Sequence, residues 1–264
     1  MKIINRLYLL SAMIALQFFF SDTNVYAFHP SDPGKPHILI YTKNGKGFVH
    51  KNIPNSIKAL KKLLDENSMT YEASEDPSLF TDKNLENFNL LIFSNTNNEA
   101  FDNDQQRQAF QKYIQNGGGF VGIHSASGSE RDWPWFWAML GGKFFRHSPF
   151  QYFNIVKIDP DHPAATPVPD YWQREDESYY LKELNPDIHV ILATDLTSID
   201  DEKVLDYPSN TFGKYFPVSW YHTFDGGYQW YTSLGHAPES YDDPVFMKHI
   251  LGGIQWVLDA KSKN

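Results

Sequence analysis

The fold is decided by one stretch, Gly117-Gly118-Gly119-Phe120-Val121-Gly122-Ile123-His124-Ser125-Ala126. It contains a glycine break, a short apolar strand and an abrupt polar turn that begins at His124. In open α/β sheets such a turn lies at the carboxyl edge of the strands, where ligands bind. Glycine at position 122 would let a neighbouring backbone or ligand approach closely. The pattern predicts that His124 lies at the rim of a pocket; an ordinary strand exit with a locally bonded histidine is the alternative.

Short apolar runs alternate with amphipathic segments before this stretch. Residues 37–41, 69–73 and 89–94 are predicted strands. Residues 53–67 have one apolar face and form a predicted helix, and a second helix, capped by Asp102 or Asp104, runs to about Asn116. Strands and helices that alternate in this way favour a parallel α/β sheet with helices on both faces.

After the stretch the pattern changes. The predicted elements there are a short helix at 133–140, strands at 150–158 and 188–193, and a helix at 244–259. The segment Phe224-Asp225-Gly226-Gly227 separates two aromatic runs and predicts a β-hairpin. Residues 194–213 are polar and rich in turn formers, which indicates a surface excursion.

The first 27 residues read as a secretory signal peptide. A basic start is followed by a largely apolar run from Leu7 to Phe20 and by the small-residue exit Val25-Tyr26-Ala27. The run is short for a membrane span, so no stable membrane span is expected after signal removal, although a retained anchor is the alternative. We therefore predict an exported protein, periplasmic or extracellular, whose domain comprises residues 28–264.

Composition narrows the possible chemistry. The net charge of -9 argues against nucleic acid as a partner, because phosphate binding needs a basic face. The chain has no cysteine, which excludes disulfides and thiolate catalysis. Aromatic residues make up 16% of the chain and suit sugar faces as well as cores. The sequence does not predict an oligomeric state.

Several histidines follow predicted strands and so should converge on one edge of the sheet. They are His50, His124, His147, His222 and His236, and Glu177 adds a carboxylate. Such a cluster can perform acid–base chemistry near neutral pH or bind a divalent metal such as zinc. No short motif of the HExxH kind is present, so a metal would need ligands that are far apart in sequence.

These motifs together resemble the ThuA-like (trehalose-utilisation) family. The resemblance rests on residues 118–126, Trp133, 141–144 and His147, and on the later segments 161–163, 176–179, 217–220 and 233–236, which follow in the family's order. It covers nearly all of residues 28–264. It implies a class I glutamine amidotransferase-like fold, which is a flavodoxin-like, doubly wound, mostly parallel sheet with extra antiparallel strands.

The same resemblance excludes the chemistry of the amidotransferases. In those enzymes a cysteine on a tight turn is served by a distant His-Pro-Glu run. Here His124 takes the turn position, and His236-Ala237-Pro238-Glu239 resembles the run with one residue inserted. Without a cysteine, glutamine hydrolysis through a thioester is not possible, so only the scaffold and the pocket position carry over.

ThuA-like proteins are associated with disaccharide use through 3-keto-sugar intermediates, which implies a small-molecule carbohydrate as partner. A ketone acidifies the adjacent C–H bond, so a base could remove that proton while an acid protonates the leaving glycosidic oxygen. We expect His124 as the base or carbonyl polariser, with His236 and Glu177 as acid or orienter. The residues expected to bind the substrate are His50, His147, Ser125, Trp133, Trp220 and His222.

Two other functions fit the same residues. The protein could be a non-catalytic carbohydrate-binding or accessory protein, or it could be a metal-dependent hydrolase. No cofactor is certain, and a divalent metal is possible. Oxidation by NAD is not expected, because Gly117-Gly118-Gly119 precedes its strand instead of following it.

Overall fold

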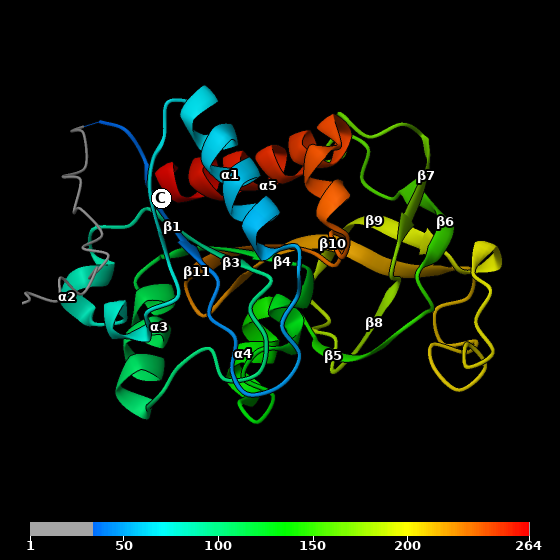
Figure 1. Cartoon of the computed structure of the whole chain (residues 1–264), viewed down its shortest axis with the longest axis horizontal. Helices are drawn as coiled ribbons and strands as arrows, with labels where there is room; N and C mark the ends of the chain where they lie inside the picture. The colour runs from blue at the N-terminus through cyan, green and yellow to red at the C-terminus, as the bar shows by residue number, and fades with distance from the viewer. Residues whose placement is uncertain (1–33, 264) are drawn as a thin grey trace, which may run out of the picture. The chain divides into compact units, whose positions relative to one another are not determined.

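The computed structural model describes residues 34–263, which are built around a nine-stranded sheet (Figure 1). In spatial order the strands are β2 (Thr70–Ser74), β1 (His37–Tyr41), β3 (Leu90–Ser94), β4 (Gly119–Ile123), β11 (Gly227–Thr232), β10 (Tyr215–Phe224), β9 (His189–Asp195), β6 (Gln151–Lys157) and β7 (Tyr171–Asp176). The predicted signal peptide at 1–27 lies outside the described residues. No helix within 34–263 is long and apolar enough to cross a membrane.

The sheet has a parallel half and an antiparallel half. Strands β2, β1, β3, β4 and β11 pair parallel with one another. From β11 onward, β10, β9, β6 and β7 pair antiparallel. The predicted hairpin is confirmed: β10 and β11 are joined at Asp225 and Gly226, whose φ angles of 49° and 91° suit a tight primed turn.

Helices cover both faces of the sheet, as the alternating pattern predicted. The long helices α1 (Ile53–Glu66) and α5 (Pro244–Ser262) lie on one face, and α3 (Asp104–Gln115) and α4 (Pro134–Leu140) lie on the other (Figure 1). Leu60 and Ile254 belong to the core cluster on the first face, whereas Phe110 and Phe136 belong to the cluster on the second. The continuous apolar strands are thus buried from both sides.

The structure corrects one local expectation and adds strands that were not predicted. Asn103 caps α3 instead of Asp102 or Asp104, since its Oδ1 accepts the Gln106 N–H at 3.0 Å. Residues Lys143–His147 form a strand, β5, which pairs with β8 (Tyr179–Lys182) in a separate two-stranded sheet. Strand β7 was not predicted from the sequence. Its residues alternate between exposed and buried, but two of the buried ones, Arg174 and Asp176, are charged, so no alternation of apolar and polar residues is visible.

Buried neutral histidines make the fold sensitive to acid. Burial lowers the pKa of His249 on α5 to about 3, and it lowers the pKa values of His162 and His222 to about 4. The unfolded chain binds protons at these residues from about pH 6.5 downward, whereas the folded chain does not. The free energy of unfolding should therefore fall between about pH 6.5 and pH 4, by up to ~1.4 kcal/mol per pH unit for each histidine.

Urea unfolding at several pH values checks this expectation. His249→Gln removes one of the titrating groups, so its stability should depend less steeply on pH than that of the unchanged protein. His189→Gln is the matched control, because His189 is exposed. A free energy of unfolding that stays constant between about pH 6.5 and pH 4 would contradict the argument.

Candidate active site

The turn after β4 holds His124 in an unusual backbone conformation. Its φ is 53°, in the left-handed region that few residues other than glycine adopt, and such strain is concentrated at functional sites. Tyr231 Oη donates to the His124 carbonyl at 2.8 Å and holds the turn in place. A Cβ at Gly122 would lie 2.9 Å from the Tyr231 ring, so this glycine makes room for that ring. His124 itself is fully buried.

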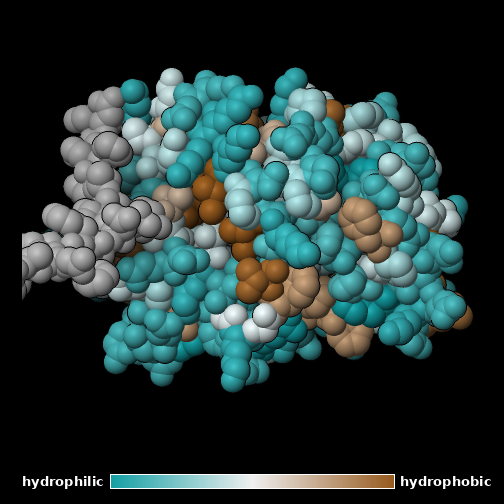
Figure 2. Space-filling view, viewed as in Figure 1, coloured by the Kyte–Doolittle hydropathy of each residue, from teal (hydrophilic) through white to brown (hydrophobic). Residues whose placement is uncertain are grey.

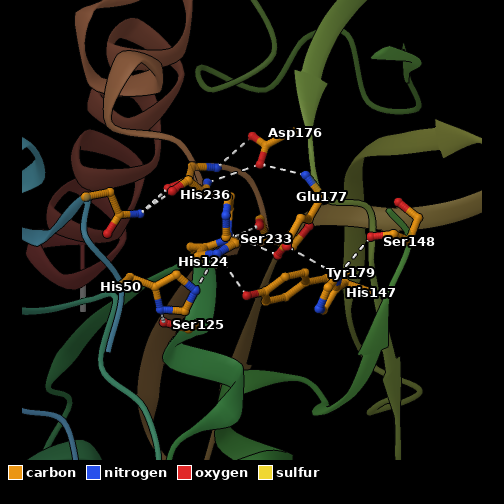
Figure 3. A network of polar contacts seen from close by, with 12 residues as sticks. His50, His124, Ser125, His147, Ser148, Asp176, Glu177, Tyr179, Ser233 and His236 are labelled. Atoms are coloured by element: carbon orange, nitrogen blue, oxygen red, sulfur yellow. Dashed lines mark hydrogen bonds and ion pairs between the residues drawn. The ribbon is translucent and has the colours of Figure 1, made fainter. Parts of the chain in front are cut away.

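Three imidazoles from separate segments meet at the carboxyl edge of the parallel strands (Figure 3). His50 follows β1, His124 follows β4 and His236 follows β11. The Nε2 atoms of His50 and His124 are 3.2 Å apart, and the potential ligand atoms of all three residues lie within 4.8 Å of one another. The structure thus brings together three of the five histidines that were expected to converge, in the one arrangement within residues 34–263 that could hold a metal ion through three such groups.

The Nδ1 atom of each imidazole in this trio faces an oxygen. His124 Nδ1 lies 2.7 Å from the Ser233 carbonyl, which can only accept, so this nitrogen carries the proton. His50 Nδ1 lies 3.2 Å from Ser125 Oγ, and His236 Nδ1 lies 3.0 Å from Glu177 Oε2. If each Nδ1 donates to its oxygen, all three Nε2 atoms carry a lone pair, and that of His124 accepts from Tyr179 Oη at 2.8 Å. Contacts of this kind orient imidazole ligands in metal sites.

Burial controls the charge of two members of the trio. It lowers the pKa of His124 well below its usual value and lowers the pKa of His50 to about 4, so both are neutral at pH 7. At His236 burial also acts against the charged form, but the Glu177 carboxylate beside it prevails and raises its pKa. Neutral imidazoles are the form that binds metal.

Glu177 and Tyr179 complete the polar groups around the trio. Glu177 Oε1 lies 3.3 Å from His147 Nδ1, so this carboxylate contacts both His147 and His236. Tyr179 Oη lies 2.8 Å from His124 Nε2, and burial raises its pKa well above the usual value, so it is a neutral donor to that lone pair. Sequence reasoning missed Tyr179, although it lies two residues after Glu177 in a segment that the family resemblance includes.

Asp176 is the second residue that sequence reasoning missed. Its carboxylate is fully buried and accepts the backbone N–H groups of Gly235 and His236 at 2.9 and 3.1 Å, respectively (Figure 3). It also accepts from the Glu177 N–H and from Arg174 Nε. One carboxylate thus positions both His236 and Glu177. The signals in the sequence were its position beside Glu177 and its place in the family segment 176–179.

A second polar contact holds the His236 loop from the opposite side. Asn52, which is fully buried just after His50, donates from Nδ2 to the Gly235 carbonyl at 2.6 Å and to the His236 carbonyl at 2.9 Å. The loops after β1 and β11 are therefore joined directly, which explains how His50 and His236 keep their positions.

A pocket of about 430 Å³ opens over the trio, a size suited to a small molecule. Its lining includes His50, His147, Glu177, Tyr179 and His236, together with Phe48, Asn97, Ser125, Gly128, Arg131 and Phe144. His124 lies behind this lining. The expected residues His50, His147, Ser125, Glu177 and His236 thus all reach the pocket.

Three residues that were expected to bind substrate lie elsewhere. Trp220 is fully buried and donates to the Leu140 carbonyl, so its ring presents no face to a sugar. His222 is buried against the Met139 carbonyl, because β10 runs antiparallel and its last residues lie at the opposite edge. Trp133 stacks on Trp135 and lines a separate hollow. The expectation that these three share the histidine pocket is wrong.

Comparison with known proteins identifies the family. A family model described as trehalose utilisation (ThuA) matches residues 37–257. The structure of a ThuA-like protein from Bacteroides uniformis is 24% identical with a TM-score of 0.69, covering 87% of this chain and 95% of that one. A ThuA-like protein from Parabacteroides merdae is 19% identical with a TM-score of 0.65, covering 86% and 91%.

A β-galactosidase from Bacillus circulans shares the fold over 31% of its own length and 86% of this chain, with 12% identity and a TM-score of 0.53. No curated protein matches the sequence. At these identities the solved structures show the fold alone, whereas the family model spans most of the chain. The chain therefore belongs to the ThuA (trehalose utilisation) family, which indicates a carbohydrate-related role, and it has the glutamine amidotransferase-like fold of that family.

Proposed function

We propose that this protein is an exported enzyme of carbohydrate metabolism that acts on 3-keto-disaccharides or related 3-keto-glycosides. In this proposal His50, His124 and His236 hold a divalent metal ion. The observation that carries it is the common arrangement of the trio, in which each Nδ1 faces an oxygen and the Nε2 atoms of His50 and His124 face each other. The family description, trehalose utilisation, supports a carbohydrate as substrate.

The donor set fits a small transition-metal ion such as zinc. Two nitrogens that each lie about 2.0–2.1 Å from a tetrahedral zinc ion are roughly 3.3 Å apart. The two Nε2 atoms of His50 and His124 are 3.2 Å apart. Three protein ligands are typical of catalytic zinc sites, and His50 and His236 also line the pocket.

Acid–base chemistry beside a ketone suits the remaining groups. A bound cation would polarise the keto oxygen at C3 of the sugar. His147, whose Nδ1 lies 2.8 Å from the Ser148 carbonyl and next to Glu177, has Nε2 free to take the proton from C2. The C2–H electron pair then forms a C1–C2 double bond as the C1–O bond breaks. The Tyr179 hydroxyl gives its proton to the leaving oxygen, and the proton that His147 took from C2 returns to Tyr179 through water, so that both groups are restored.

This assignment revises the expected roles without adding residues outside the pocket. His124 would hold the metal ion through Nε2 instead of acting as the base, since it is fully buried behind the lining. Glu177 orients His147 and His236 through its two oxygens. His236 becomes a ligand.

Metal content and turnover test the proposal together. Purified protein comprising residues 28–264 should contain about one divalent metal ion per chain by elemental analysis. It should release free sugar from the 3-keto derivative of trehalose, lose this activity with a chelator and regain it when metal is restored. Full turnover by the metal-free protein would overturn the metal site. Trehalose binding without turnover of any keto-sugar would favour the accessory-protein alternative.

Export is tested separately, by N-terminal sequencing of the protein made in a secretion-competent bacterium. We expect the mature chain to begin near Phe28 and to be found in the periplasm or the medium. A full-length chain in the membrane fraction would show that the first segment is retained as an anchor.

A further inference from the structure

Two exposed phenylalanines lie beside the histidine trio. Phe48, in the loop between β1 and α1, is 62% exposed, and Phe150, just before β6, is 44% exposed. Figure 2 shows a mainly hydrophilic face on which hydrophobic side chains gather near the middle, over the loop between β1 and α1. Phe48 lines the pocket, and the Phe150 ring contacts His236, which also lines it. Exposed apolar rings that are grouped mark a binding surface more often than scattered ones do.

The two rings contact different imidazoles of the trio. The Phe48 ring lies 4.8 Å from that of His50, and the Phe150 ring lies 5.6 Å from that of His236, measured between centroids. The His50 and His236 rings are 5.4 Å apart. Among the described residues, 34–263, the Phe48 ring contacts His50 and the Phe150 ring contacts His236, and the two phenylalanine rings are not in contact with each other. Phe48 therefore lies beside one imidazole of the pair and Phe150 beside the other.

We propose that Phe48 and Phe150 are two sugar subsites, so that the substrate is a disaccharide or a longer glycoside with one ring against each phenylalanine. The inference rests on the proposed function, because it places the reacting glycosidic bond over the His50–His236 pair. The C–H face of a pyranose ring is apolar and packs against an aromatic side chain, while its hydroxyls remain available to polar groups. These two phenylalanines take the role that was expected of Trp133 and Trp220.

Single substitutions separate the two subsites. Phe48→Ala and Phe150→Ala should each raise KM for the 3-keto derivative of trehalose about tenfold, the effect of exposing one ring face of a sugar, and should leave kcat nearly unchanged. Phe48→Tyr keeps the flat ring and should restore KM. With methyl 3-keto-glucoside, which has a single sugar ring, only one of the two alanine variants should raise KM.

Phe145→Ala is the matched control. Phe145 is 45% exposed, but its ring lies 5.8 Å from Tyr207 and carries the Lys182 ammonium over its face, so its surroundings differ from those of Phe48 and Phe150 beside the trio. Its removal should leave KM unchanged for both sugars. Unchanged KM in both test variants, or an equal rise for the one-ring and two-ring sugars in both variants, would overturn the subsites.

Calorimetric binding of trehalose distinguishes this proposal from the proposed reaction. If the unchanged protein binds trehalose but turns over no keto-sugar, weaker binding in Phe48→Ala and Phe150→Ala still supports the subsites while the reaction fails. Absence of trehalose binding to the metal-loaded protein would overturn the subsites.

Sedimentation of the variants gives a further check, since a dimer that Phe48→Ala converts to a monomer would show that the exposed ring contacts a second copy.

Discussion

His124→Asn should lower kcat/KM for the 3-keto derivative of trehalose by at least about a thousandfold, the usual range for losing a central catalytic group. The substitution removes the Nε2 atom that faces His50 Nε2 at 3.2 Å. Asparagine tolerates the left-handed backbone at φ 53°, so the turn is kept. Because His124 contributes one of three metal ligands in the proposal, bound metal should fall together with turnover.

The measurement combines steady-state kinetics with elemental analysis of the same preparation. His189→Asn is the control, since His189 is an exposed histidine on β9 and should leave both values unchanged. Circular dichroism verifies that the His124 variant is folded. A His124→Asn protein with ordinary turnover would remove His124 from the mechanism, whatever its metal content.

Asp176→Asn should have the largest effect on stability, a loss of about 3–5 kcal/mol in the free energy of unfolding. Asp176 is fully buried and accepts three backbone N–H groups as well as Arg174 Nε. An amide in its place would turn an NH2 group toward some of these donors and leave Arg174, itself buried, with less compensation for its charge. The loop that holds His236 would lose two of its contacts, so turnover should fall as well.

Asp201→Asn supplies a matched comparison. Asp201 is also a carboxylate that pairs with an arginine, Arg146, at 2.6 Å, and it does not line the pocket. It should lower the urea unfolding midpoint without changing kcat/KM, whereas Asp176→Asn should lower both. Equal stability of Asp176→Asn and the unchanged protein would show that this carboxylate does not hold the site.

The parallel half of the sheet and the place of the His124 turn at the carboxyl edge could be predicted from sequence because both depend on local patterns, although His124 is buried behind the pocket lining and not at its rim. A continuous apolar run such as 119–123 is buried from both sides, and a polar turn after such a run lies at the carboxyl edge. The hairpin at Asp225 and Gly226 could also be predicted from the sequence, since the left-handed backbone conformations of its turn favour the pair Asp-Gly. The absence of cysteine excludes thiolate chemistry by composition alone.

The antiparallel half could not be predicted in the same way. The reversal of β10 carries His222 to the opposite edge, and that direction follows from strand pairing, which the residues of β10 do not encode locally. Strand β7 shows no alternation of apolar and polar residues, because Arg174 and Asp176 occupy buried positions. Their charges are satisfied by partners far away in sequence, such as Asp243 and the backbone of Gly235.

The sequence by itself determined the α/β class, the carboxyl edge as the place of the site, and the chemical inventory of imidazoles and carboxylates available there. Only the tertiary structure decided which of them meet. It brought His50, His124 and His236 together from three loops, buried Trp220 and placed Phe48 and Phe150 beside the imidazoles. Local patterns record which face of an element is apolar, whereas the distance between two loop residues depends on strand order and on contacts such as Asn52 with the His236 loop.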